Sequence, residues 1–335
     1  MACAKAQVCC LWCSGVDKPP EKIIRPEYLP SANSEAQHKF AYMLWLSNTP
    51  ENDTENFDAD RYFVASRVLL WQLFHDPVTK ASKDIDVIVM CGPRVGEAHK
   101  ERLRQDGAII HTVDVPHTPN DGWISPEESR WGDIMGKLHA WELEEYSRIL
   151  LLDGDIILQS PLDDIFNDPG VVTMRTKSGI GRKSDEPDLP DEYLLCGFME
   201  LNSRDHDWPP SDRGRTPGYF NAGFFMLQPN KKIYKYFIGL LDIPNRFDSR
   251  YMEQNLLNYA HRWDGAMPWK EINAKWNAKL VMDQDLEGGL VSLHEKWWDL
   301  IYSATKTLGN FASSKKFRAE GYWQAEKELQ QHEKN

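Results

Sequence analysis

The sequence predicts an α/β fold in which a mostly parallel central sheet is flanked by helices. Short apolar runs rich in Val, Ile and Leu alternate with segments whose apolar residues recur at helical spacing. The first part of the chain follows a strand, helix, strand, helix, strand order, which is typical of parallel sheets. The 335 residues suit one large domain with additions or two small ones, and the hydrophobic share of 41% is ordinary for a globular protein.

The first expected elements follow a tail. Residues 1–36 are rich in Pro, Ser, Lys and Glu without periodicity, which predicts a flexible N-terminal tail. The apolar run "FAYMLWL" ends in polar residues, "RYFVASRVLLWQLF" has helical spacing, and "DIDVIVMCG" is a strand closed by glycine. The elements expected here are strand 38–48, acidic loop 50–60, helix 61–74, strand 84–92, helix 96–106 and strand 108–115.

The second half continues the alternation and completes a domain over residues 37–308. "GDIMGKLHAWELEEY" predicts a helix that leads into the strand "RILLLD", and Pro161 ends the apolar stretch that follows. A long stretch crowded with Gly, Pro, Asp and Arg is too long for a simple connection, so we expect a lid or an acceptor-binding insertion there. The elements expected in this half are helix 132–146, insertion 175–217, strand 219–230, helix 249–263, strand 288–298 and a C-terminal helix and tail 309–335.

Composition and charge limit the partners and the location. The formal net charge is -12 and no long basic stretch is present, which argues against nucleic acid as a partner. No segment approaches the roughly 20 apolar residues that span a bilayer, and residues 1–16 lack the features of a secretory signal. The sequence therefore predicts a cytoplasmic protein. Four cysteines within the first 13 residues indicate a reduced tail, or a Golgi or membrane association if this end is acylated or incomplete.

Two aspartates one glycine apart follow a buried strand in "RILLLDGDIILQS". Ligands of open parallel sheets lie beyond the carboxyl ends of the strands, so Asp153 is expected in the ligand crevice. Gly154 lets the backbone turn or a ligand approach closely. Asp153 and Asp155 then converge on one point, where a hard divalent ion, Mn²⁺ or Mg²⁺, fits better than zinc. A tight turn that merely caps a strand is the structural alternative.

Two chemistries use this motif after a hydrophobic strand. In haloacid-dehalogenase-like phosphatases the first aspartate is a nucleophile, but that motif normally opens the domain and is followed by Thr or Val. Here about 110 residues of α/β structure precede it, and Ile156 takes the next place. In nucleotide-sugar transferases the aspartates hold the metal ion that bridges the diphosphate of the donor.

The surrounding motifs favour the transferase. The run "KLHAWELEEYSRILLLDGDIILQSPLDDIF", the later "YFNAG", the "EQNLLN" helix and His294 together resemble the retaining glycosyltransferases of family 8, the relatives of glycogenin and of bacterial galactosyltransferases. That family has the GT-A fold, a Rossmann-like nucleotide-diphospho-sugar transferase fold. The resemblance covers roughly residues 38 to 300, and four matching pieces in the same order make it specific.

The resemblance implies roles for individual residues. Asp153, Asp155 and His294 would hold the metal ion, and a UDP-sugar would be the donor. The residues expected to bind the nucleotide or donor sugar are Ser47, Asn48, Tyr62, Lys137, Gly154, Asn221, Ala222 and Gly223. Gln254 would lie under the anomeric carbon, and Lys296 would be the cation beside the leaving diphosphate. Glu253 stands where the family usually has Asp, which puts the identity of the sugar in doubt.

The implied activity is the transfer of a hexose, glucose or galactose, from a UDP-sugar to an acceptor hydroxyl with retention of configuration. Same-face attack is favoured over a covalent intermediate, because Glu253 and Gln254 offer no well-placed nucleophile. The acceptor can be a glycan, a protein or a small molecule. An aspartate-nucleophile phosphatase and a catalytically inactive binding protein with the GT-A fold are the alternatives.

Overall fold

A computed structural model describes residues 39–47, 57, 60–180, 182–211, 213–299 and 305–333. These residues belong to one compact unit, His38–Asn335. The expected N-terminal tail, Asn48 and nearly all of the acidic loop 50–60 lie outside the described residues.

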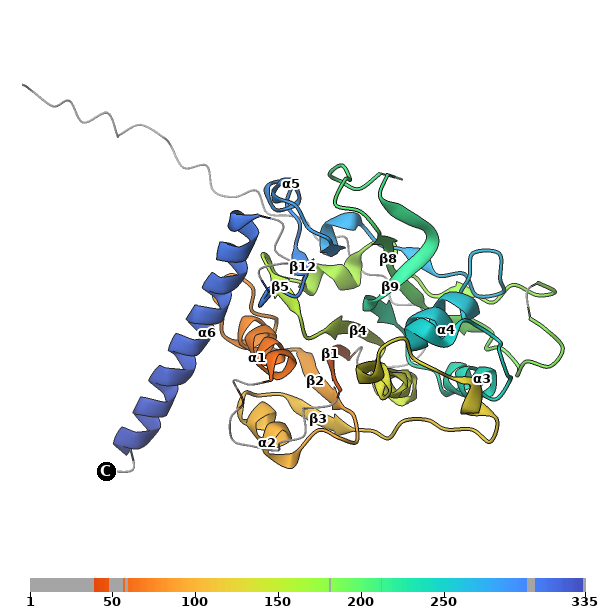
Figure 1. Ribbon diagram of the computed structural model, residues 1–335, viewed down its shortest axis with the longest axis horizontal. Coiled ribbons are helices and arrows are strands. Elements are labelled where there is room, and N and C mark those ends of the chain that lie inside the picture. Colours follow the sequence, from red (N-terminus) through yellow and green to blue (C-terminus); the bar gives the residue numbers. More distant parts are fainter. Residues whose placement is uncertain are drawn as a thin grey trace, which may run out of the picture. The chain divides into compact units, whose positions relative to one another are not determined.

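A seven-stranded sheet forms the centre of the fold (Figure 1), in the strand order β10-β8-β9-β4-β1-β2-β3. Its strands are β1 (Phe40–Leu46), β2 (Ile85–Cys91), β3 (Ile109–Thr112), β4 (Arg148–Asp153), β8 (Leu195–Leu201), β9 (Arg215–Leu227) and β10 (Lys270–Glu271). Four of the neighbouring pairs are parallel, and only β9 runs antiparallel to its neighbours β4 and β8. The expectation of a mostly parallel central sheet is confirmed.

A second, three-stranded sheet starts directly after β4. Its strands are β5 (Ile156–Leu158), β11 (Ala278–Lys279) and β12 (Ser292–His294). Strand β12 runs antiparallel to β5, with His294 opposite Ile156. The chain therefore passes from one sheet to the other between Asp153 and Ile156, and the pairing brings His294 to that same point. A third, two-stranded sheet pairs β6 (Met174–Arg175) with β7 (Glu192–Tyr193).

Helices cover the central sheet, and its two faces carry separate hydrophobic clusters. Along β1, Met43 and Trp45 face one cluster, while Tyr42 and Leu44 face the other. Helix α1 begins where the Asp60 side chain accepts hydrogen bonds from two backbone N–H groups of its first turn. The α-helices are α1 (Arg61–Phe74), α2 (Glu97–Gln105), α3 (Lys231–Leu241), α4 (Met252–Ala260), α5 (Asp283–Glu287) and α6 (Lys306–Glu333).

The expected C-terminal helix is present as α6, which packs against α1. Lys315 on α6 forms a buried ion pair with Asp76 just after α1, at 2.6 Å. The Arg67 guanidinium of α1 lies 3.8 Å from the centre of the Trp323 ring. The apolar side of α6 joins a cluster with Leu293 of β12, so the helix supports the strand that carries His294.

Several expected elements differ from the structure. The expected strand 288–298 is only β12, Ser292–His294, because the chain turns at residues 288–289 after α5 and again after His294. The segment expected as helix 132–146 forms a 3₁₀ stretch, Ile134–Glu142, because Gly136 packs directly beneath the Trp45 indole and glycine weakens an α-helix. The expected helix 249–263 is α4, Met252–Ala260, preceded by a 3₁₀ turn. The stretch 175–217 is not a single insertion, because it contains β8, a buried strand of the central sheet.

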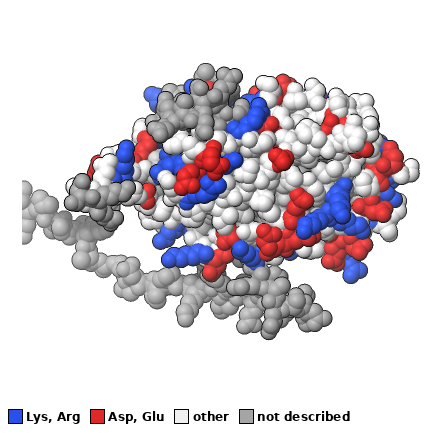
Figure 2. All heavy atoms as spheres, turned by 90° about the horizontal axis from the view of Figure 1, so that it is seen from below, with Lys and Arg blue, Asp and Glu red and all other residues white. Residues whose placement is uncertain are grey.

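Two findings concern the surface of the molecule. Figure 2 shows one face on which Lys and Arg side chains lie beside Asp and Glu side chains. Among the helices that the structure describes, none combines the length and the apolar character needed to cross a bilayer. The exclusion of nucleic acid as a partner stays a prediction.

Candidate active site

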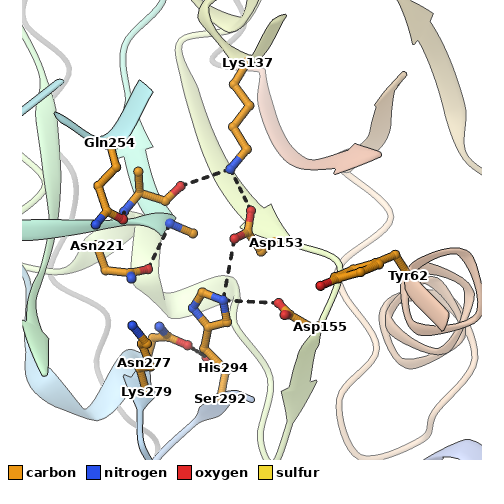
Figure 3. Close-up of polar contacts among 12 residues, drawn as sticks. Tyr62, Lys137, Asp153, Asp155, Asn221, Gln254, Asn277, Lys279, Ser292 and His294 are labelled. Carbon is orange, nitrogen blue, oxygen red and sulfur yellow. Dashed lines mark hydrogen bonds and ion pairs between the residues drawn. The ribbon is translucent and has the colours of Figure 1, made fainter. Parts of the chain in front are cut away.

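Asp153, Asp155 and His294 meet where the two sheets join (Figure 3). His294 Nε2 lies 3.2 Å from Asp155 Oδ1 and 3.6 Å from Asp153 Oδ2. One potential ligand atom from each residue lies within 4.8 Å of the other two. Asp153 ends β4, Asp155 precedes β5 and His294 ends β12, so strand pairing rather than loop geometry fixes the cluster.

Three features of the cluster suit a divalent metal ion. Asp155 Oδ1 is buried and meets His294 Nε2 at 3.2 Å as an ion pair, but it accepts no hydrogen bond of good geometry from the described part of the chain. A Cβ on Gly223 would lie 2.6 Å from Asp153 Oδ2 and closer still to His294 Cε1, so glycine keeps this space open. Two carboxylates with one imidazole suit Mn²⁺ or Mg²⁺ better than a thiolate-preferring ion.

The electrostatics of the cluster favour a positive charge between the carboxylates. Burial alone would raise the pKa of Asp155, but the adjacent His294 outweighs burial and holds that pKa below its usual range. Burial would lower the pKa of His294, and the Asp155 and Asp153 carboxylates raise it instead. The carboxylates thus stabilise a cation at this point.

Lys137 is a buried partner of the cluster. Its ammonium donates to Asp153 Oδ1 at 2.8 Å, to Glu253 Oε1 at 3.1 Å and to the Ala222 carbonyl at 3.4 Å. Burial lowers the pKa of Lys137, and the Asp153 and Glu253 carboxylates more than offset this, so its pKa is raised. With a side chain that is 1% exposed, Lys137 is not the solvated surface charge that its helical pattern also allowed.

Glu253 is buried at the start of α4. Burial raises the pKa of its carboxyl to about 7, although Lys137 opposes the shift. The residue before it, Met252, has a positive φ of 44°, a strained conformation for a residue with a side chain. The strained residue thus lies directly before the carboxylate that accepts from Lys137.

Strand β9 contributes the expected Asn-Ala-Gly segment. Asn221 Oδ1 accepts from the Gly223 N–H at 2.9 Å, and Asn221 Nδ2 donates to Glu200 of β8 at 2.5 Å. The Ala222 N–H donates to Gln254 Oε1 at 2.9 Å. Both ends of the Asn221 side chain are therefore fixed, one by its own strand β9 and the other by the neighbouring strand β8.

Gln254 is held in one orientation. While its carbonyl accepts from Ala222, its amide group donates to the Tyr219 hydroxyl at 3.1 Å. The two bonds link the first turn of α4 to β9 and direct the side chain into the site (Figure 3).

Two cavities meet at this cluster, and Asp153 and Asn221 line both. The β1-side cavity has a volume of about 550 Å³ and the α4-side cavity about 530 Å³. Of the expected site residues, those lining the β1-side cavity are Ser47, Tyr62, Asp153, Gly154, Asp155, Asn221, His294 and Lys296. Those lining the α4-side cavity are Lys137, Asp153, Asn221, Ala222, Gly223, Glu253 and Gln254. The structure thus brings together every expected site residue that it describes.

Two residues of the β1-side cavity have other neighbours than expected. The Tyr62 hydroxyl accepts from Arg130 at 2.6 Å, and the Tyr62 ring meets the edge of Trp298 with ring centres 5.0 Å apart. Gly154 is required by packing, since a Cβ there would overlap the Ser66 hydroxyl.

The sequence analysis did not identify three residues that line the cavities, Arg130, Glu200 and Lys279. Arg130 lines the β1-side cavity from a 3₁₀ turn, Ser129–Trp131, in a segment without periodicity. Lys279 lines both cavities and donates to Glu200 at 2.5 Å. Glu200 lies in the apolar run "LLCGFMEL", and a buried acid within such a run was the available signal.

Comparison with known proteins agrees with this geometry. The model of the family "Glycosyl transferase family 8" matches residues 73–289. An uncharacterized protein of Schizosaccharomyces pombe is 30% identical over 82% of this chain and 76% of its own length. Galactinol synthase 4 of Arabidopsis thaliana is 25% identical over 71% of this chain and 66% of its own.

Among solved structures, the glycosyltransferase GlyE of Streptococcus pneumoniae aligns with 87% of this chain and 64% of its own, at 14% identity and a TM-score of 0.48. The family model covers more than half of the chain, and the resemblance noted in the sequence is confirmed. The phosphatase alternative is thereby excluded. The chain belongs to glycosyltransferase family 8.

Proposed function

We propose that this protein is a metal-dependent retaining hexosyltransferase that uses a UDP-sugar as donor. The observation that carries the proposal is the cluster of Asp153, Asp155 and His294, which lies where the β1-side and α4-side cavities meet. The nucleotide would occupy the β1-side cavity and the sugar the α4-side cavity. The bond to be broken, between the anomeric carbon and the diphosphate, then lies beside the cluster.

Asp153, Asp155 and His294 would hold Mn²⁺ or Mg²⁺. When bound, such an ion supplies Lewis-acid stabilisation of the departing diphosphate. Arg130 and Lys296 line the same cavity and can donate charge-assisted hydrogen bonds to phosphate oxygens. Lys137 holds the Asp153 carboxylate in place from the opposite side, through its 2.8 Å bond.

The α4-side residues would orient the sugar. Gln254 and Asn221 are fixed by hydrogen bonds and line the cavity, so their positions do not depend on the ligand. Glu253 is buried and bonded to Lys137, which makes it a poor nucleophile and supports same-face attack. In that route the acceptor oxygen bonds to the anomeric carbon as its bond to the diphosphate breaks, and the acceptor proton passes to the departing phosphate oxygen.

The test is UDP release from a panel of UDP-sugars by the full-length chain, without acceptor. Because relatives carry the name galactinol synthase, UDP-galactose is tried first and UDP-glucose second. We expect Mn²⁺-dependent release from one donor, lost with EDTA and in Asp153→Asn. The matched control is Asp264→Asn, which changes a carboxylate that is 87% exposed and lies outside both cavities.

Failure of the whole panel, together with no stabilisation by UDP plus Mn²⁺ in thermal unfolding, would contradict the proposal. That result would favour the non-catalytic binding protein. Release that persists in EDTA would contradict the metal dependence alone.

A further inference from the structure

The α4-side cavity extends past the residues expected to bind the donor sugar. Beyond Gln254 and Asn221, its lining includes Trp131, Glu200, Thr216, Asp248, Tyr251 and Asn255. We infer that this part binds an uncharged polyhydroxylated acceptor, a sugar or a polyol, and discriminates against anionic acceptors. The inference rests on the proposed function, because it assigns the acceptor of that same site.

The cations of this cavity are already neutralised. Lys137 is bonded to Asp153 and Glu253, and Lys279 donates to Glu200 at 2.5 Å. These two lysines are the only Lys or Arg side chains among the described residues that line the cavity, against four carboxylates. A phosphate or carboxylate on the acceptor would lose its hydration there without gaining a cation, which is costly.

The remaining groups suit hydroxyls and apolar ring faces. The rings of Trp131 and Tyr251 lie 5.8 Å apart and are inclined by 50°, and Tyr251 is 43% exposed. Sugar and polyol rings present apolar C–H faces that aromatic side chains can cover. The Asp248 carboxylate is paired with Arg250, and the Asn255 amide is bonded to the Tyr219 hydroxyl and the Asp248 carbonyl. Both line the cavity and retain lone pairs, and Asn255 a second N–H, for hydroxyl groups around this pair.

The size and the origin of the lining agree with a small acceptor. About 530 Å³ lies within the range of small-molecule sites, and part of it would be filled by the donor sugar. Glu200 is the next-to-last residue of β8 and Thr216 is the second residue of β9, so both come from the 175–217 stretch. That stretch was expected to be a lid or an acceptor-binding insertion, and its contribution to the cavity is these two strand positions.

The experiment compares matched pairs of acceptors with the full-length chain and the donor found by hydrolysis. Each pair joins an uncharged compound to its anionic counterpart: a hexose with its 6-phosphate, a hexose with its uronic acid, and a polyol with its phosphate. We expect a glycosylated product from at least one uncharged member, at roughly ten times the kcat/KM of its counterpart or more. Equal use of anionic members, or use of neither class, would overturn the inference.

The outcome is separable from that of the proposed function. Donor hydrolysis needs no acceptor, so hydrolysis without use of uncharged acceptors sinks this inference and leaves the transferase standing. Loss of hydrolysis itself would sink both.

A charge variant gives a second test. Glu200→Gln retains a carbonyl for Asn221 but no longer neutralises Lys279. We expect the ratio of kcat/KM for an anionic acceptor to that for its uncharged counterpart to rise roughly tenfold. A merely structural role would lower both values and leave the ratio unchanged, which would count against the inference.

The matched control is Glu192→Gln, which removes an exposed carboxylate of the same stretch, paired with Arg175 outside the cavity. Its ratio should equal that of the natural protein. If Glu200→Gln does not fold, Asp248→Asn replaces it, because that side chain is 48% exposed and its loss of charge should shift the ratio in the same direction.

Discussion

The β1-side and α4-side cavities share Asp153 and Asn221, yet cations outnumber carboxylates in the lining of the first and carboxylates outnumber cations in the lining of the second. The lining of the β1-side cavity includes four Lys or Arg side chains and three carboxylates. The lining of the α4-side cavity includes two such cations and four carboxylates. One cavity therefore suits a diphosphate, whereas the other suits an uncharged, hydroxyl-rich ligand.

Burial differs between the two cavities as well. Arg130 of the β1-side cavity has a side chain that is 39% exposed and pairs with the exposed Glu128. Lys137 of the α4-side cavity is 1% exposed and pairs with Glu253, which is 4% exposed. Residues of the first kind can act on a ligand with little effect on folding, while residues of the second kind belong to the folded core.

The largest effect is expected from Lys137→Met. Removal of the ammonium leaves the buried Glu253 and the partly exposed Asp153 without their cation, which costs about 3–5 kcal/mol of unfolding free energy. Urea denaturation measures this loss. The control is Lys231→Met, whose exposed pair with Glu144 contributes less than about 1 kcal/mol. A loss of unfolding free energy for Lys137→Met as small as that of the control would show that the buried pairing of Lys137 contributes no more to stability than an exposed ion pair.

A pH effect on stability is expected from Glu253. Its folded pKa of about 7 lies above the unfolded value of 4.5, so the folded state binds the proton more tightly and loses stability as pH rises from 4.5 to 7. Glu253→Gln lacks this pH-dependent loss. As pH rises from 4.5 to 7, its unfolding free energy should therefore increase relative to that of the natural protein by on the order of 3 kcal/mol. Urea denaturation of both proteins at pH 4.5 and pH 7.5 measures the gain.

Two other titratable groups near Glu253 do not account for the expected difference between the proteins. Lys137 is protonated throughout the interval, so it contributes no slope of its own. His294, whose pKa the Asp155 and Asp153 carboxylates raise, is present in both proteins, so its contribution cancels to first order in the difference between them. Parallel pH profiles for the two proteins would show that the Glu253 carboxyl is not shifted.

The cluster of Asp153, Asp155 and His294 could be predicted from the sequence more completely than the two cavities beside it, since Arg130 of the β1-side cavity and Glu200 of the α4-side cavity were both missed. Asp153 and Asp155 are separated by a single glycine and follow an obvious strand, and His294 was placed by the resemblance to family 8. Glu200 depends instead on the pairing of β8 with β9, which is interrupted by bulges between Gly197 and Leu201. Pairing of this kind is decided by distant residues and is not written in local periodicity.

Lys137 illustrates the other limit of sequence reasoning. The resemblance implied a donor contact for Lys137, whereas its burial against β9 and α4, which local spacing does not show, makes it a partner of Asp153 and Glu253. The same tertiary packing turns the expected helix around it into a 3₁₀ stretch, since Gly136 lies against Trp45. Local patterns identified the residue types of the site, while long-range packing determined which of their charges are paired.

Gly223→Ala probes the boundary between the cavities. The added Cβ would overlap His294 Cε1 and lie 2.6 Å from Asp153 Oδ2, and both atoms belong to the metal cluster. We expect Mn²⁺ affinity, measured by calorimetry, to fall roughly 10-fold to 100-fold. Gly321→Ala on α6, where a Cβ meets nothing within 4 Å, is the control and should leave affinity unchanged. Unaltered Mn²⁺ affinity in Gly223→Ala would show that the cluster of Asp153, Asp155 and His294 does not bind the ion.

The smallest effect is expected from Arg130→Met in the β1-side cavity. The change removes a guanidinium that lines the cavity, so the Kd for UDP should rise roughly tenfold through lost charge-assisted hydrogen bonds. The change breaks an exposed ion pair with Glu128 and one hydrogen bond to the Tyr62 hydroxyl, so the unfolding free energy should fall by only about 1 kcal/mol. Arg175→Met, at a side chain that is 90% exposed, is the control for both quantities. Weaker UDP binding with so small a loss of stability would sharpen the contrast with Lys137, whereas a large loss of stability would show that cations of both cavities are structural.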